Sequence, residues 1–130
     1  MNTKEWYAAL TKPTWAPPDW VFGPVWSVLY IIIAISFGYV FYKIYQGSLS
    51  YWVGLPFLLN LVFNIAYSPL QFGLKSNELA SLDILLVLTT LAWAMYMIYP
   101  EYKWVALVNI PYFLWVSFAT VLQLTITYLN

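Results

Sequence analysis

The sequence predicts an all-α integral membrane protein: a four-helix bundle with an N-terminal lid segment. Apolar residues make up 63% of the chain and charged residues only 8%, whereas soluble domains average about 45–50% and about 25%. The charges are also clustered, so that three long stretches carry none and a fourth carries only Asp83. Because a water-soluble domain needs a charged surface, we expect the lipid bilayer to surround most of the chain.

Charge and composition exclude several classes of function. The formal net charge is zero, so nucleic acid is not an expected partner, since phosphate neutralisation needs a basic surface. Cysteine and histidine are absent, which removes disulfides, thiol nucleophiles and the usual zinc and haem ligands. Asp83 therefore lacks a His, Cys or intramembrane Lys to work with, and conventional hydrolytic or transfer catalysis is not expected.

Residues 1–19 differ in character from the rest of the chain. They combine charged residues with Trp, Tyr and three prolines, which makes them too polar and too short to span a bilayer. They are also too aromatic for a free tail. We expect an extended lid lying over one end of the bundle, within a single domain that covers residues 1–130.

Four membrane helices follow, separated by short polar connectors. We expect them over about residues 20–45, 51–74, 78–99 and 104–128. Residues 20–42 alone would extend about 34 Å at about 1.5 Å per residue, enough to cross the hydrocarbon core. Short connections favour an up-down bundle with both chain ends on one side.

Local signals mark the helix ends and one interruption. Ser76 or Asn77 is expected to cap the third helix, with Glu78 well placed in its first turn. Pro111 lies inside the fourth helix, where it should free a carbonyl near Leu107 and kink the helix.

Polar side chains gather in the half of the bundle beneath the lid. Helix rise places five of them at similar depths: Trp26, Asn64, Asp83, Trp115 and Gln123. The amides are equally explained as interhelical hydrogen-bond partners, and the acid as a tie between helices. The two indoles lie too deep for an interfacial belt, so they face either the core or a cavity. The apolar walls and few donors of such a cavity would suit a porphyrin, a sterol or a drug-like heterocycle.

The sequence resembles the TspO/translocator-protein family, also called tryptophan-rich sensory proteins or peripheral benzodiazepine receptors. The residues that carry the resemblance are Trp6-Tyr7, Leu10, Lys12-Pro13, Trp15, Pro17-Pro18, Trp20 to Trp26 and Leu29-Tyr30, then Leu61 to Asn64, Ser68-Pro69-Leu70, Phe72-Gly73, Ala80, Asp83-Ile84, Pro111-Tyr112, Trp115, Phe118-Ala119-Thr120 and Leu122. The match covers nearly the whole chain.

The resemblance implies a pocket beneath the lid that binds porphyrins, sterols and isoquinoline or benzodiazepine ligands. It implies pocket residues Tyr7, Trp26, Asn64, Trp115 and Ala119, with an apolar wall of Phe22, Gly23 and Leu122. Bacterial members are associated with tetrapyrrole transport, stress sensing and light-dependent porphyrin breakdown.

The sequence departs from the family's pattern in three respects. Family members have five helices and the lid follows the first, so we expect this chain to lack that helix and to have an open seam, a lipid-filled flank or a partner in its place. Polar or smaller residues stand at four family positions: Tyr67, Gln71, Gln123 and Thr127. Leu124 replaces the Tyr of the sterol-recognition tail in animal members, which argues against sterol specificity.

We therefore expect a multi-pass protein of a prokaryotic cell membrane that binds, senses or carries flat hydrophobic molecules, above all tetrapyrroles. No cofactor is required. Without an axial His or Cys, metal-free protoporphyrin should bind about as well as haem. The alternatives are tryptophan-dependent photo-oxidation of porphyrin, or a structural subunit without ligand. The small residues Ala34 and Gly38 favour a homodimer, although they would also suit packing within one bundle.

Overall fold

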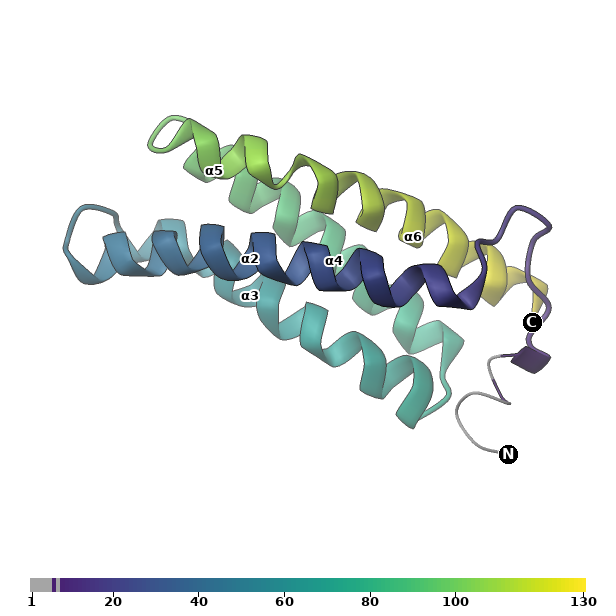
Figure 1. Ribbon diagram of the computed structural model, residues 1–130. Coiled ribbons are helices and arrows are strands. Elements are labelled where there is room, and N and C mark those ends of the chain that lie inside the picture. The colour runs from purple at the N-terminus through teal and green to yellow at the C-terminus, as the bar shows by residue number, and fades with distance from the viewer. Residues whose placement is uncertain (1–5, 7) are drawn as a thin grey trace.

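The computed structural model of the chain describes residue 6 and residues 8–130, without the side chains of residues 19 and 72. Its helices run nearly parallel to one another in one elongated bundle (Figure 1). The elements are the 3-10 helix η1 (Asp19–Val21), α2 (Phe22–Tyr45), α3 (Tyr51–Ser68), the π-helical turn η2 (Pro69–Gly73), α4 (Asn77–Ile98), α5 (Lys103–Val108) and α6 (Ile110–Leu129). The described residues contain no strand, so the all-α class is confirmed.

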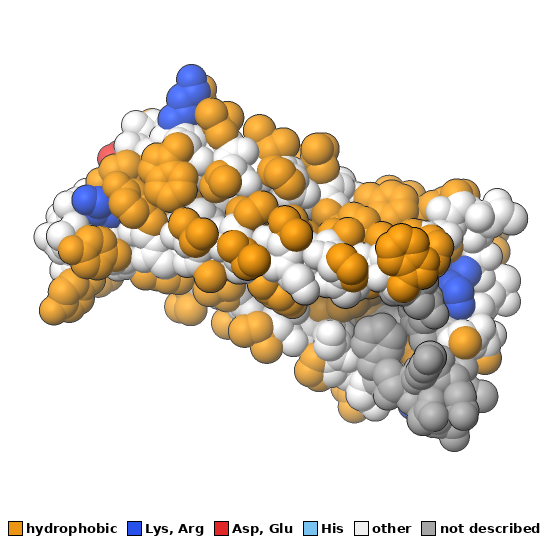
Figure 2. Space-filling model, in the orientation of Figure 1, with side chains coloured by type: hydrophobic (Ala, Val, Ile, Leu, Met, Phe, Trp, Pro, Cys, Tyr) orange, Lys and Arg blue, Asp and Glu red, His pale blue; other side chains and the backbone are white. Residues whose placement is uncertain are grey.

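Four of these helical segments are long and apolar enough to cross a membrane: Phe22–Tyr45, Tyr51–Gln71, Asn77–Ile98 and Lys103–Leu129. On the face shown in Figure 2, hydrophobic side chains cover the middle of the bundle and lysines lie near its two ends. Large apolar side chains such as Ile31, Ile35 and Ile65 are more than half exposed. Such a surface is stable in lipid and not in water. The chain is therefore a multi-pass membrane protein.

Helix α4 is the centre of the bundle, because it packs along both α3 and α6. Its buried apolar residues recur every three or four positions, so they form one face. They are Ala80, Ile84, Val87, Leu91, Ala94 and Ile98.

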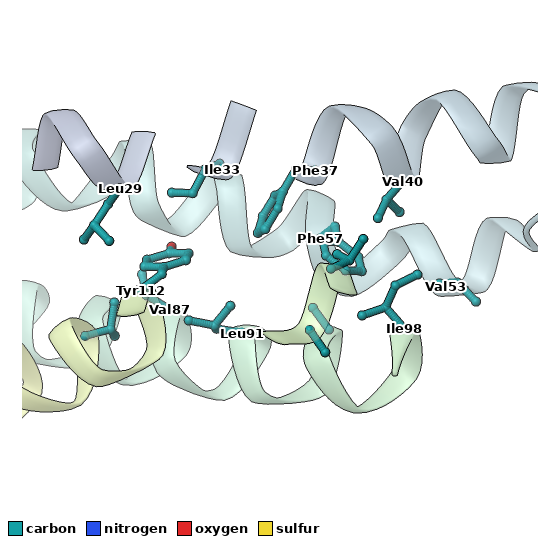
Figure 3. Close-up of a cluster of buried hydrophobic side chains, with 14 of the residues drawn as sticks. Leu29, Ile33, Phe37, Val40, Val53, Phe57, Val87, Leu91, Ile98 and Tyr112 are labelled. Carbon is teal, nitrogen blue, oxygen red and sulfur yellow. The ribbon is translucent and has the colours of Figure 1, made fainter. Parts of the chain in front are cut away.

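Helix α2 contributes a narrower buried stripe and leaves a wide flank uncovered. Leu29, Ile33, Phe37 and Val40 point towards the neighbouring helices (Figure 3). The ring of Phe37 meets that of Phe57 from α3 edge to face, with centroids 4.8 Å apart. Edge-to-face rings attract through their quadrupoles and fix the spacing of the two helices.

The helix ends and the interruption follow the local sequence. The Ser76 hydroxyl accepts from the Leu79 N–H at 3.1 Å and caps α4, as predicted. The kink expected from Pro111 is a break at Asn109, between α5 and α6. Proline has no N–H to give the preceding turn. At the break, the Asn109 side chain donates to the Val105 carbonyl of α5 at 2.8 Å and to the Ser36 hydroxyl of α2 at 3.0 Å, so it bridges the break to α2.

The N-terminal segment lies at the same end of the bundle as the C-terminus (Figure 1). The Thr11 N–H donates to the Asn130 side chain at 3.1 Å. The ring of Trp15 meets that of Phe118 in α6, with centroids 5.8 Å apart. This end of α6 therefore holds the segment that precedes α2.

Candidate functional site

Aromatic rings from α2 and α6 face each other just below the N-terminal segment. Phe22 meets Trp115 with ring centroids 5.7 Å apart, and Trp26 meets Tyr112 with centroids 6.4 Å apart. Both pairs are edge to face. The pairing follows from helix geometry, since residues four apart on α2 and three apart on α6 each share a face, and the two helices run in opposite directions.

Trp115 sits in the middle of a series of ring contacts. Its centroid is 5.5 Å from that of Phe118, which in turn touches Trp15 of the N-terminal segment. The indole nitrogen Nε1 of Trp115 is buried and has no hydrogen-bond partner among the described residues. A buried N–H normally finds an acceptor. An acceptor on a ligand would satisfy this one.

A chain of hydrogen bonds runs beside the aromatic pairs and joins all four spans. The Tyr30 hydroxyl of α2 donates to Oδ1 of Asn64 in α3 at 3.2 Å. The Asn64 amide donates to the Tyr112 hydroxyl of α6 at 2.8 Å, and that hydroxyl donates to Oδ1 of Asn60 at 2.9 Å. Asn60 finally donates to the Val87 carbonyl of α4 at 2.9 Å. Asn64 thus takes part in interhelical bonding, and both of its tyrosine partners contact the ring of Trp26.

A second polar cluster lies closer to the C-terminal end of α6. The Tyr67 hydroxyl donates to Oε1 of Gln123 at 2.6 Å, and the Gln123 amide lies 3.3 Å from the hydroxyl of Thr127. Thr127 and Ser81 of α4 share a hydrogen bond of 2.6 Å. Gln123 therefore links three helices. It is buried among side chains that satisfy it.

Asp83 is buried inside the bundle, with 4% of its surface exposed. Its carboxylate oxygen Oδ2 has no hydrogen-bond partner in the part of the chain that the structure describes. The described residues also contain no group of three acidic side chains that would hold a metal ion. One oxygen of the Asp83 carboxylate is thus a buried acceptor without a partner among the described residues.

Among the predicted site residues, the structure pairs Phe22 with Trp115 through their rings. It places Trp26 and Asn64 around the same two tyrosines, Tyr30 and Tyr112. Ala119 lies one turn beyond Trp115 on α6 and is half-buried, and Leu122 is buried. Gly23 is exposed, and a side chain placed there would meet nothing within 4 Å. Tyr7 lies outside the described residues.

A groove of about 580 Å³ opens beside Trp115 between α2 and α6. Its walls are almost entirely apolar, and its lining residues are Pro24, Val25, Val28, Leu29, Pro111, Leu114, Trp115 and Phe118. Pockets for small molecules are commonly about 300–1,000 Å³ in volume. The groove lies between the two helices that carry the aromatic pairs. Trp115 belongs to one of these pairs and also lines the groove.

Three polar members of the site were not singled out as site residues by the sequence: Tyr30, Asn60 and Tyr112. A signal was present for two of them. Asn60 lies one turn before Asn64 on the same face of α3, and Tyr112 one turn before Trp115 on α6. Only the packing of the helices shows that their polar atoms meet.

Comparison with known proteins gives a consistent match along the chain. The model of the TspO/MBR family matches residues 1–129. The tryptophan-rich protein TspO of Bacillus cereus is 41% identical over 128 residues, which cover 98% of this chain and 82% of that protein. An uncharacterised membrane protein of Bacillus subtilis, YtaB, is 40% identical over 98% of this chain and 81% of its own length. The human translocator protein is 37% identical over 91% of this chain and 70% of its own length.

Proposed function

The chain belongs to the TspO/MBR family, and on this basis we propose that it binds flat hydrophobic ligands, tetrapyrroles such as protoporphyrin above all, at the aromatic site between α2 and α6. In this role it is a membrane-embedded receptor or carrier. The N-terminal segment acts as the lid of the site, and the bound ring system lies against the indoles of Trp26 and Trp115.

The observation that carries the proposal is the buried, unpartnered indole N–H of Trp115 within a layer of aromatic rings. A planar aromatic ligand gains offset or edge-to-face contacts with such rings. An acceptor atom on the same ligand removes the cost of the orphaned donor. Ala119, one turn nearer the lid, is half-buried, and its small side chain would let a ring system approach α6 closely.

The adjoining groove supports a ligand that dissolves in the bilayer. Its lining is apolar and contains no charged residue, so a charged or strongly polar molecule gains nothing there. Porphyrin rings, which are large, flat and mainly apolar, fit this chemistry. Titration of the purified protein with protoporphyrin, followed by tryptophan fluorescence, tests the proposal, and absence of saturable binding would instead favour a structural subunit without ligand.

A second candidate function is light-dependent oxidation of the bound porphyrin with dioxygen as the oxidant. It is favoured by the two indoles of Trp26 and Trp115, which belong to the same aromatic layer as Phe22 and Tyr112. The chromophore would absorb the light, and the indoles would be the protein groups closest to it.

The uncovered flank of α2 supports assembly as a homodimer. Ala34 and Gly38 are both exposed, and a side chain at Gly38 would meet nothing within 4 Å. Small residues spaced by four let two membrane helices approach closely. We therefore include a second copy of the chain among its partners, together with the lipid bilayer.

A further inference from the structure

We propose that Tyr112 and Asn60 are positioning residues that fix the direction of the Asn64 side-chain amide in the ligand site. Neither residue needs to touch the ligand for this role. The inference rests on the proposed function for its consequence in binding, but the hydrogen-bond chain that carries it exists without a ligand.

The series of hydrogen bonds starts at a backbone carbonyl of α4, which fixes the donor and the acceptor of its first bond. The carbonyl oxygen of Val87 can only accept, so the group of Asn60 that lies 2.9 Å from it must be the amide nitrogen Nδ2. The same nitrogen lies 3.2 Å from the Thr90 hydroxyl, which gives its own proton to the Leu86 carbonyl at 2.7 Å and is free to accept. Two acceptors on α4 thus hold the Asn60 nitrogen, and Oδ1 of Asn60 faces the other way.

The orientation of the Asn60 amide determines in turn which bond the Tyr112 hydroxyl donates and which it accepts. Its hydroxyl has one proton, and that proton is donated to Oδ1 of Asn60 at 2.9 Å. The Tyr112 oxygen must therefore accept in its other hydrogen bond, the one of 2.8 Å from the Asn64 amide. Asn60 and Tyr112 have no exposed surface and Asn64 only 7%, so water does not offer the alternative partners that it would at a surface.

Asn64 is the last residue of the series, and its bond with Tyr112 fixes the orientation of its side-chain amide. Its Nδ2 faces Tyr112, so its carbonyl Oδ1 faces α2, where the Tyr30 hydroxyl donates to it at 3.2 Å. The two tyrosines that bond Asn64, Tyr30 and Tyr112, both contact the ring of Trp26. We infer that the second amide hydrogen of Asn64 faces the ligand site, while its carbonyl is engaged by Tyr30.

Turning the Asn64 amide over would break the chain. Its carbonyl would then oppose the Tyr112 oxygen, whose only proton is committed to Asn60. Each orphaned buried polar group costs on the order of 1–3 kcal/mol. A change at Asn60 would remove this constraint, because the Tyr112 proton would become available to an Asn64 carbonyl.

The direct test measures hydrogen exchange of the Asn64 side-chain amide by 15N NMR in detergent, with the signal assigned by its loss in Asn64→Asp. We expect exchange at least about tenfold faster in Tyr112→Phe and in Asn60→Leu. The control Tyr96→Phe, which removes the hydroxyl of an exposed tyrosine of α4, should leave it unchanged. Unchanged exchange in both folded variants would overturn the proposal.

The consequence for binding is tested with two tricyclic probes of similar shape, 9-fluorenone, which accepts a hydrogen bond, and carbazole, which donates one. Each displaces bound protoporphyrin from the purified protein. We expect the wild type to prefer fluorenone about fivefold, and both variants to discriminate less than about twofold. Equal affinities in the wild type, or the same preference in the variants, would overturn the positioning role. Failure of protoporphyrin itself to bind contradicts the proposed function, and the exchange experiment then still decides the role of Tyr112 and Asn60.

Discussion

Asn130 holds the backbone of Thr11 through two hydrogen bonds. The Thr11 N–H donates to Oδ1 of Asn130 at 3.1 Å, and Nδ2 of Asn130 donates to the Thr11 carbonyl at 2.9 Å. The two residues stand 119 positions apart in the sequence. This pairing joins the segment before the first span to the end of the last, so both must lie on the same side of the membrane.

Cysteine labelling tests that topology on a chain that has no cysteine of its own. Thr14→Cys and Tyr128→Cys each place a thiol at an exposed position, one in the N-terminal segment and one near the end of α6. A membrane-impermeant maleimide should label both from the same side of sealed vesicles. Labelling from opposite sides would show that the number of membrane crossings differs from four.

The break between α5 and α6 should depend on Asn109 for its stability. Asn109→Ala removes the bonds to Val105 and Ser36, and hydrogen bonds within membrane proteins contribute about 0.6 kcal/mol each on average. We expect the free energy of unfolding, measured by titration with a denaturing detergent, to fall by about 1 kcal/mol.

The control for this measurement is Thr89→Ala, which removes an exposed hydroxyl bonded only to the Leu85 carbonyl of its own helix. Its effect should stay within about 0.5 kcal/mol. A loss in Asn109→Ala no larger than that of the control would show that the bridge does not stabilise the break.

Gly38→Leu tests the proposed dimer. The added side chain fits the monomer, since nothing lies within 4 Å of its first carbon, but it would keep two α2 helices apart. We expect the mass of the detergent-solubilised protein to fall to that of one chain. Val62→Leu, on the exposed face of α3, is the matched control and should keep the dimer. A monomeric wild type would exclude the dimer. A dimer that survives Gly38→Leu would show that the two copies meet at another surface.

Illumination separates a receptor from a photo-oxidase. If the second candidate function holds, protoporphyrin bound to the wild type should lose its absorption under light and dioxygen faster than free protoporphyrin. The rate should fall in Trp26→Phe and Trp115→Phe, because the ring that replaces the indole is harder to oxidise. An absorption spectrum of bound protoporphyrin that stays unchanged under light in the wild type would contradict photo-oxidation and favour a receptor or carrier.

Much of the fold was predictable from the sequence because the bilayer imposes a simple rule. Backbone polar groups must be satisfied within a span, so long uncharged stretches are helices. Ser76 and Pro111 then mark a helix end and an interruption by chemistry that depends only on neighbouring residues. The position of the break, at Asn109, was less predictable because it also depends on Ser36, which lies 73 residues away.

The sequence predicted the depth of the site residues in the membrane, but not the contacts between them. Helix rise places Trp26, Asn64 and Trp115 at one level, but it says nothing of the rotation of one helix against another. The bonds of Asn64 depend on that rotation. So does the role of Tyr112, which belongs to a motif of the resemblance but was not predicted as a pocket residue.

The departures from the family's pattern show the same dependence on packing. Tyr67, Gln123 and Thr127, three of the four unusual positions, are linked to one another by hydrogen bonds. The fourth, Gln71, joins them through Asn77, since it bonds the Asn77 side chain while Thr127 bonds the Asn77 carbonyl. Positions that look like separate exceptions along the chain form one polar cluster in space.

Titration of three variants with protoporphyrin tests the ligand site most directly, with the dissociation constant read from quenching of tryptophan fluorescence. We expect Trp115→Phe and Ala119→Leu each to weaken binding at least about fivefold, because a stacked, hydrogen-bonded indole contributes about 1 kcal/mol or more and a larger side chain at Ala119 fills space needed by the ring system. The control Trp52→Phe changes an exposed indole at the start of α3 and should leave the affinity within twofold of wild type. Affinities within twofold of wild type for both Trp115→Phe and Ala119→Leu would contradict the site between α2 and α6.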